Sequence, residues 1–101
     1  MKIITPGHFY DLENFLNANS TDQRIQFVQK VPAAEGSVVV VNGTTNEEVL
    51  AMLIDRLGHL NGKFPCRENS IAITHIETAL LWLNKRTSDR LKRGVEGQHK
   101  A

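Results

Sequence analysis

"TTNEEVLAMLIDRLGHLNGKFPCRENSIAITHIETALLWLNKRTSDRLKRG", residues 44–94, repeats its apolar residues at the spacing of an α-helix, with one short interruption. The first helix has a start signal, because Thr45 followed three residues later by Glu48 forms a capping box that satisfies exposed backbone N–H groups. We expect this helix to end near residue 61, with Gly62 as its stop signal. Its apolar stripe consists of Val49, Leu50, Leu53, Ile54, Leu57 and Leu60.

A second helix is predicted from Pro65, which fits the first turn of a helix, to about Gly94. Its apolar positions are Ile73, Ile76, Leu80 and Leu83. Because the connection through residues 61–65 is short, we expect the two helices to be antiparallel neighbours. The second helix is the longer one, so its last turns, about three, are expected to have no partner in the hairpin. Phe64 and Cys66, on either side of Pro65, are expected to plug the tip with apolar surface.

Residues before the hairpin have the spacing of β-strands. In "RIQFVQKV" (24–31) Ile25, Phe27 and Val31 fall on one face and Arg24, Gln26 and Lys30 on the other, which predicts a strand. "SVVVV" (37–41) is a short β-branched run that predicts another. "PAAEG" (32–36) is typical of the loop between them. "HFYDLENFL" (8–16) fits either a strand or a short helix, and "NANSTD" (17–22) is typical of a loop.

The expected fold class is therefore α+β. We predict a single domain covering residues 1–101, since a chain of this length with 41% apolar residues is able to bury a core. It consists of a small N-terminal antiparallel β-core (1–43), a two-helix antiparallel hairpin with a long second helix (44–97) and a tail (98–101).

Several classes of protein are disfavoured by composition. The single cysteine excludes an internal disulfide, and four scattered histidines without cysteines at ligand spacing predict no metal site. No cofactor motif is present either. The opening "MKIITPGHFY" lacks the apolar segment of a signal peptide, and no run approaches the roughly 20 apolar residues that span a bilayer. We therefore expect a cytoplasmic protein that has no contact with a membrane.

Charge is distributed unevenly along the chain. Residues 85–101 hold six basic and two acidic side chains, a balance of +4, whereas residues 1–84 hold six basic and nine acidic ones, a balance of −3. The total of only +1 and the six aromatic residues argue against a protein that coats a polyanion. The cationic end needs a different explanation.

The cations of this end share one side of the second predicted helix. At 100° per residue, Trp82, Arg86, Arg90 and Arg93 fall within a sector of roughly 80°. One interpretation is a solvated helix end whose cations complement the helix dipole. Another is a phosphate site, because the planar fork of arginine binds phosphate in a bidentate manner where lysine would serve solubility equally well. Three arginines match a ligand with one or two phosphates better than duplex nucleic acid, which needs many phosphate contacts.

The hairpin resembles the helical hairpin of the phage-encoded cyclic-nucleotide sponges, which blunt Thoeris and CBASS immunity, and it is most similar to the anti-Thoeris branch. The resemblance covers over half of the chain, and its most specific pieces are "CREN" (66–69), "ALLWLNKRT" (79–87) and "RGVEG" (93–97). It implies a non-catalytic homo-oligomer, a hexamer, that works in the host bacterial cytoplasm. It also implies ligands held between subunits: cyclic ADP-ribose isomers made by TIR enzymes, or cyclic di- and trinucleotides made by CBASS synthases.

The same resemblance implies four ligand-contacting positions. They are Asn69 near the hairpin tip, Arg86 and Arg90 on the second helix, and His59, which would stack on a base. Asn69 and Arg86 are about 25 Å apart if they share one helix, too far for one small nucleotide to touch both. A pocket therefore needs the tip of one hairpin against the arginine face of another.

Three further residues are weaker candidates for ligand contacts: Arg56, Thr74 and Arg93. The backbone amides of "RGVEG" can also approach an anion, although a plain helix C-cap explains Gly94. No residue is assigned a catalytic role, since no nucleophile lies in a motif that supplies both a base and its orienting group. The alternative functions are a protein-interaction hairpin, a nucleic-acid-binding module and, with least support, an enzyme that cleaves the signal molecule.

Overall fold

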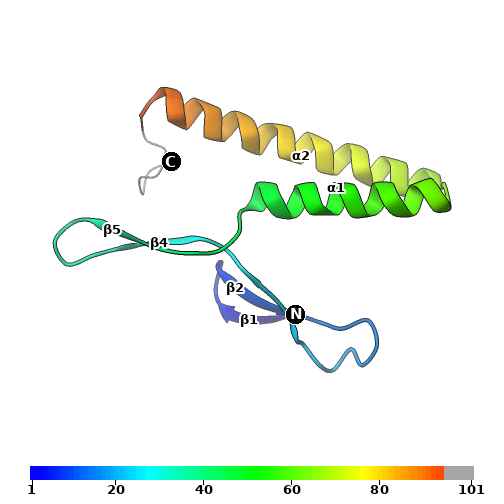
Figure 1. Ribbon diagram of the computed structural model, residues 1–101, viewed down its shortest axis with the longest axis horizontal. Coiled ribbons are helices and arrows are strands. Elements are labelled where there is room, and N and C mark those ends of the chain that lie inside the picture. The colour runs from blue at the N-terminus through cyan, green and yellow to red at the C-terminus, as the bar shows by residue number, and fades with distance from the viewer. Residues whose placement is uncertain (95–101) are drawn as a thin grey trace. The chain divides into compact units, whose positions relative to one another are not determined.

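The computed structural model describes residues 1–94, and these residues form two compact units, one from Met1 to Thr45 and one that begins at Asn46. The first unit contains five short strands and the second contains two helices, of which the second is longer. Figure 1 shows the strands followed by the paired helices. The predicted α+β class, with antiparallel strands before a helical hairpin, is therefore confirmed.

Three strands of the first unit make an antiparallel sheet in the order β1-β2-β3, from β1 (Lys2–Thr5), β2 (Phe9–Leu12) and β3 (Gln23–Gln26). The ambiguous stretch at 8–16 thus contains a strand. Apolar side chains of this sheet line a shallow depression of about 340 Å³ on one face: Met1, Tyr10, Leu12, Ile25 and Phe27. The rings of Tyr10 and Phe27 meet edge to face with their centroids 6.0 Å apart, a favourable aromatic arrangement.

A cross-strand ion pair also holds β2 to β3. Asp11 and Arg24 are partners in the strand register, and the Nε atom of Arg24 lies 3.0 Å from Oδ1 of Asp11. The Asp11 residue is only 5% exposed. A carboxylate this buried requires a cationic partner. The Asp11–Arg24 pair therefore helps to fix the register of β2 against β3.

The predicted strand at 24–31 is wrong as a single element. It divides into β3 and β4 (Gln29–Pro32), and β4 pairs with β5 (Val38–Val41) in a separate two-stranded sheet. The break occurs because the chain returns here before entering the helices: Thr44 N–H donates to Gln26 O (2.8 Å), and Val28 N–H donates to Thr44 O (2.9 Å). The returning segment therefore occupies the hydrogen-bonding groups that a continuous strand would have used.

Gly43 makes this close approach possible. A Cβ atom at Gly43 would lie 2.5 Å from the backbone carbon of Phe27, a separation that real Cβ atoms do not adopt. Only glycine lets two backbones approach this closely at the crossing. The loop between β4 and β5 is confirmed where it was predicted, with Ala33 N–H donating to Ser37 O (2.8 Å) and Gly36 in the left-handed region (φ 86°).

The second unit consists of α1 (Asn46–Lys63) and α2 (Arg67–Lys92), which run antiparallel side by side (Figure 1). Gly62 does not end α1, because Phe64 N–H still donates to Leu60 O (3.0 Å) in the helical pattern. Pro65 is not inside α2, because Cys66 is the N-cap and α2 begins one residue later. The end of α1 and the start of α2 thus both lie about two residues later than the preferences of single residues predicted.

The C-terminal end of α2 lies close to the predicted position. The helix ends at Lys92, Arg93 is the C-cap, and Gly94 follows in the left-handed conformation (φ 68°) that commonly terminates helices. Because α2 has 26 residues and α1 has 18, the excess is eight residues, or about two turns rather than the three expected.

Apolar surface is abundant on both units. No apolar side chain among residues 1–94 is fully buried. The most exposed large apolar residues of the hairpin are Phe64, Leu81, Trp82, Leu91 and Met52. Among the described residues, neither helix is long and apolar enough to cross a membrane.

Candidate functional site

The protruding end of α2 carries a shallow depression of about 260 Å³, which we call the cationic patch. It is lined by Trp82, Lys85, Arg86, Asp89 and Arg93. These residues recur at three- and four-residue spacing, so a single helix face presents all of them. The indole of Trp82 is 64% exposed, which leaves a large aromatic surface open beside the guanidinium groups. Trp82, Arg86 and Arg93, three of the four residues predicted to share one sector of the helix, thus line one depression.

An acidic residue lies within the cationic patch. Lys85 Nζ donates to Asp89 Oδ2 at 2.8 Å, one helical turn away, and this hydrogen bond lowers the pKa of the Asp89 carboxyl. Asp89 is therefore negatively charged at neutral pH and accepts a hydrogen bond from the ammonium group of Lys85. An incoming anion would compete with this carboxylate for the lysine. Neither residue was predicted as a site residue, although their i,i+4 spacing on a helix was a visible signal.

Arg90 differs from the other arginines. It does not line the depression, and it is half-buried whereas Arg86 and Arg93 are exposed. The reason lies in the helix geometry, since Arg90 is roughly 80° around from Trp82 and closest to the apolar stripe that contains Leu83. The structure thus separates Arg90 from the patch that the sequence analysis had placed it in.

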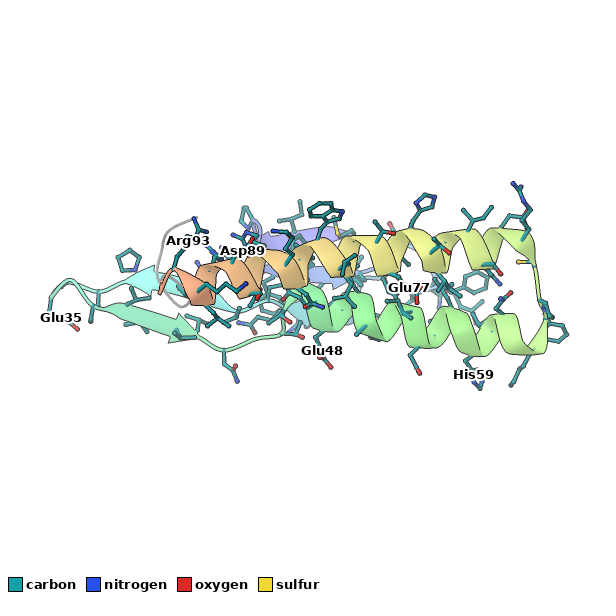
Figure 2. The ribbon with its side chains drawn as sticks, turned by 90° about the horizontal axis from the view of Figure 1, so that it is seen from above. Glu35, Glu48, His59, Glu77, Asp89 and Arg93 are labelled. Carbon is teal, nitrogen blue, oxygen red and sulfur yellow. The ribbon has the colours of Figure 1, made fainter. Side chains whose placement is uncertain are left out.

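Arg93 is exposed and also makes hydrogen bonds at the end of α2. Its backbone N–H and its Nε both donate to the carbonyl oxygen of Asp89, at 3.1 Å and 3.4 Å. The first is the last i→i−4 bond of the helix, and the second adds a side-chain donor to the same carbonyl. Figure 2 shows Asp89 and Arg93 together at this end of α2. The other residues of the "RGVEG" segment, 95–97, lie outside the described residues.

At the opposite end, the hairpin tip carries His59 and Asn69. His59 is exposed near the end of α1 and points away from α2 (Figure 2), and Arg56 is exposed one turn earlier on α1. Asn69 is half-buried in the first turn of α2, where its N–H donates to Cys66 Sγ at 3.4 Å. Arg56 and His59 thus project into solvent, while Asn69 is held against its own helix start.

Polar contacts, and not the expected apolar plug, hold the tip together. Phe64 is 79% exposed and therefore does not fill the turn. Instead, Asn61 Oδ1 accepts a hydrogen bond from Cys66 N–H (2.9 Å), and Asn61 Nδ2 donates to Ser70 Oγ (3.1 Å). This role of Asn61 was not predicted from the sequence, since an asparagine at a turn is common and its partners lie five and nine residues away.

Thr74 is exposed on α2, and its hydroxyl donates to Ser70 O at 3.1 Å. With its proton used inside the helix, this hydroxyl is left with acceptor capacity only. It therefore suits a ligand N–H or O–H group and not a phosphate oxygen.

The two groups of candidate residues lie at opposite ends of one continuous helix. Asn69 and Arg86 are both in α2, 17 residues apart, so about 25 Å separates them. One hairpin does not bring the tip and the cationic patch together. Among residues 1–94, no group of three side chains suited to holding a metal ion is present.

Comparisons with known proteins agree with the resemblance seen in the sequence. Over 59 residues, 57% of this chain, the protein is 58% identical to "Thoeris anti-defense 1" of Bacillus phage SBSphiJ7. The match spans 42% of that relative's length. The family model described as "Acb2/Tad1, hairpin domain" matches residues 19–88, which include His59, Asn69 and Arg86 as well as strands β3 to β5. Because this match covers more than half of the chain, the protein belongs to the Acb2/Tad1 hairpin-domain family.

Proposed function

We propose that this protein binds cyclic nucleotide second messengers and sequesters them without cleaving them, so that Thoeris or CBASS immune signalling is blocked in the cytoplasm of a phage-infected bacterium. The observation that carries the proposal is the cationic patch, where an exposed indole lies beside two exposed guanidinium groups on the protruding end of α2. Family membership and the name of the phage relative, "Thoeris anti-defense 1", support the biological setting.

The chemistry of the cationic patch suits a nucleotide. Guanidinium groups bind phosphate oxygens in pairs, and an exposed indole offers a stacking surface for a purine. Arg86 and Arg93 supply the first property, and Trp82 supplies the second. A cyclic ADP-ribose isomer, a cyclic dinucleotide or a cyclic trinucleotide combines both groups, so these are the proposed ligands.

A second copy of the chain completes the site in this proposal. At about 260 Å³ the depression is smaller than typical small-molecule pockets, which are roughly 300–1,000 Å³ and enclose most of their ligand. The tip, with His59 and Asn69, is the proposed opposite wall, contributed by another hairpin because one hairpin holds the two ends too far apart. His59 stacks on a base, and Asn69 bonds the base edge.

Exposed apolar surface supports the same assembly. A soluble monomer normally buries its large apolar residues, whereas none is fully buried among residues 1–94. Leu81, Trp82 and Leu91 are each more than 60% exposed on α2, a surface typical of subunit contacts. We therefore propose a homo-oligomer, a hexamer, in which the protruding α2 ends pack against neighbouring hairpins.

Sequestration differs from catalysis in what happens to the ligand. The cationic patch offers two arginines and a lysine, which suit an anion, and its carboxylate is already paired with that lysine. A ligand released from the protein is therefore expected to be chemically unchanged.

The test is a capture-and-release experiment. The purified protein is incubated with TIR-derived cyclic ADP-ribose isomers, cGAMP and a cyclic trinucleotide; free ligand is removed; the protein is heat-denatured; and the released compounds are identified by chromatography and mass. Recovery of one intact species supports sequestration, and a shortened or hydrolysed product shows an enzyme instead. If every compound stays in the free fraction, the proposed function is wrong, and the hairpin becomes a candidate for binding a host protein.

A further inference from the structure

One side chain, Asn61, ties together the two ends of the helices at the hairpin tip. It lies in the last turn of α1 and is half-buried. Its side chain bonds two residues that follow the turn: the backbone N–H of Cys66 (2.9 Å) and the hydroxyl of Ser70 (3.1 Å). Each of these partners is at the start of α2. Asn61 therefore sets where α2 begins relative to the end of α1.

The start of α2 depends on this tie because its own cap is weak. The N-cap is Cys66, and its sulfur accepts from Asn69 N–H at 3.4 Å. Sulfur is a poor acceptor compared with the oxygen of the serine, threonine, aspartate or asparagine that helices prefer at this position. Apolar packing offers little compensation, since Phe64 in the turn is 79% exposed.

A chain of contacts thus leads from α1 to Asn69. Asn61 holds the backbone of Cys66, and Cys66 holds the backbone of Asn69. His59 is two residues before Asn61 on the same helix, so the segment that carries the tie also carries the exposed imidazole. The placement of Asn69, unlike that of His59, which points away from α2, is set by the geometry of this turn.

We propose that Asn61 is a positioning residue for ligand recognition at the hairpin tip: it does not touch the nucleotide but fixes the turn so that Asn69 is presented to it. The inference rests on the proposed function above. Its physical basis is preorganisation, because a site that is already ordered loses less conformational freedom when the ligand binds.

Three variants separate this role from others. Asn61→Ala removes both hydrogen bonds, and Ser70→Ala removes only the bond to the hydroxyl. Asn61→Asp retains an acceptor for the Cys66 N–H and another for the Ser70 hydroxyl; its negative charge is favourable at the N-terminus of α2 and unfavourable in the last turn of α1, so the two dipole effects oppose each other. Asn84→Ala is the matched control, since Asn84 is an exposed asparagine of α2 far along the helix from the tip.

The measurement is ligand affinity for the compounds of the panel, together with hydrogen exchange of the Cys66 and Asn69 amides, in the full-length protein. We expect Asn61→Ala to weaken binding about tenfold, since two ordinary hydrogen bonds are lost, and to speed exchange at both amides. Ser70→Ala should have a smaller effect on both. Asn61→Asp should restore affinity and slow exchange to near the unmodified values, while Asn84→Ala should change neither.

The possible results distinguish a failure of the proposed function from a failure of the positioning role of Asn61. If the unmodified protein captures no nucleotide, the proposed function fails and this inference fails with it. If the unmodified protein binds and Asn61→Ala binds equally well, only the positioning role is wrong. A loss of binding that Asn61→Asp does not restore, accompanied by lower helix content or a smaller assembly, would show that Asn61 acts on folding alone.

Discussion

At the scale of single residues, the three arginines of the cationic end have different environments although they share a chemistry. Arg86 is exposed in the patch, Arg93 is exposed but also caps the helix, and Arg90 is half-buried at the edge of the apolar stripe. Sequence periodicity alone placed them in one sector of the helix. Burial distinguishes them, and it predicts that their substitution will have different consequences.

Arg86→Ala is expected to weaken nucleotide binding by about ten- to a hundredfold, because charge-assisted hydrogen bonds to phosphate are lost, with little change in thermal stability. Arg90→Ala should lower the unfolding temperature, since its side chain is half-buried, and should weaken binding less than Arg86→Ala, since Arg90 does not line the cationic patch. Calorimetric titration and thermal melts separate the two effects. Lys2→Ala, which removes an exposed cation from β1, serves as the charge-matched control. Unaltered affinity in Arg86→Ala would remove the proposed phosphate contact.

Asp89→Asn is expected to strengthen binding of an anionic ligand. The hydrogen bond from Lys85 lowers the pKa of the Asp89 carboxyl, so the carboxylate is charged at neutral pH and competes with the ligand for the lysine. Exposed ion pairs are weak, so we expect a gain of about two- to fivefold in affinity, declining as salt is added. A fall in affinity would show that Asp89 orients Lys85 for the ligand. Because the pKa is lowered on folding, the small contribution of Asp89 to stability is lost only as the pH falls through the acidic range below about 4.

At the scale of secondary-structure elements, local signals located the helices well and the strands less well. The 3.6-residue period and the glycine after Arg93 identified both helices, because the hydrogen bonds of a helix join residues four apart. The strand at 24–31 was predicted as one piece because Ile25, Phe27 and Val31 fall on one face, although Val28 and Gln29 interrupt the alternation. It breaks at Phe27 because Thr44, 17 residues later, bonds the residues on either side.

Gly43→Ala tests this crossing. The added Cβ would lie 2.5 Å from the Phe27 carbonyl carbon, so we expect a loss of about 1–3 kcal/mol in the free energy of unfolding, as is usual for an overpacked site. Gly58→Ala is the control, because nothing lies within 4 Å of a Cβ there and alanine favours the α1 helix by about 1 kcal/mol. Denaturant unfolding followed by circular dichroism measures both. Equal stability of the two variants would show that the crossing is not needed for the fold.

At the scale of the whole molecule, exposed apolar surface is the main feature that the individual elements do not explain. The stripes of α1 and α2 face each other, yet Leu81, Trp82 and Leu91 remain largely exposed on α2. A chain that leaves such residues in water gains stability by association. In the proposed assembly, the tip of one copy meets the cationic patch of another, which a single hairpin does not allow.

Leu81→Glu is expected to reduce the size of the assembly, because it places a charge on an apolar surface that would be buried between subunits. Light scattering coupled to size-exclusion chromatography gives the mass, which we expect to be a multiple of 11.3 kDa for the unmodified protein. Asn84→Glu adds the same charge at a polar position of α2 and should leave the mass unchanged. Nucleotide binding should fall together with the mass in Leu81→Glu. A monomeric unmodified protein that still binds nucleotide would contradict the shared site.

Information in neighbouring residues was enough to identify the helical hairpin, the turn between β4 and β5 and the grouping of Trp82 with Arg86 and Arg93, because these depend on spacings of a few residues along the chain. Contacts between residues distant in sequence determined the rest. The return of Thr44 to Gln26 and Val28 divided the long strand, and the position of Arg90 beside the apolar stripe buried it in part. Asn61 acquired its role only when the end of α1 met the start of α2, since its partners become neighbours once the hairpin has closed.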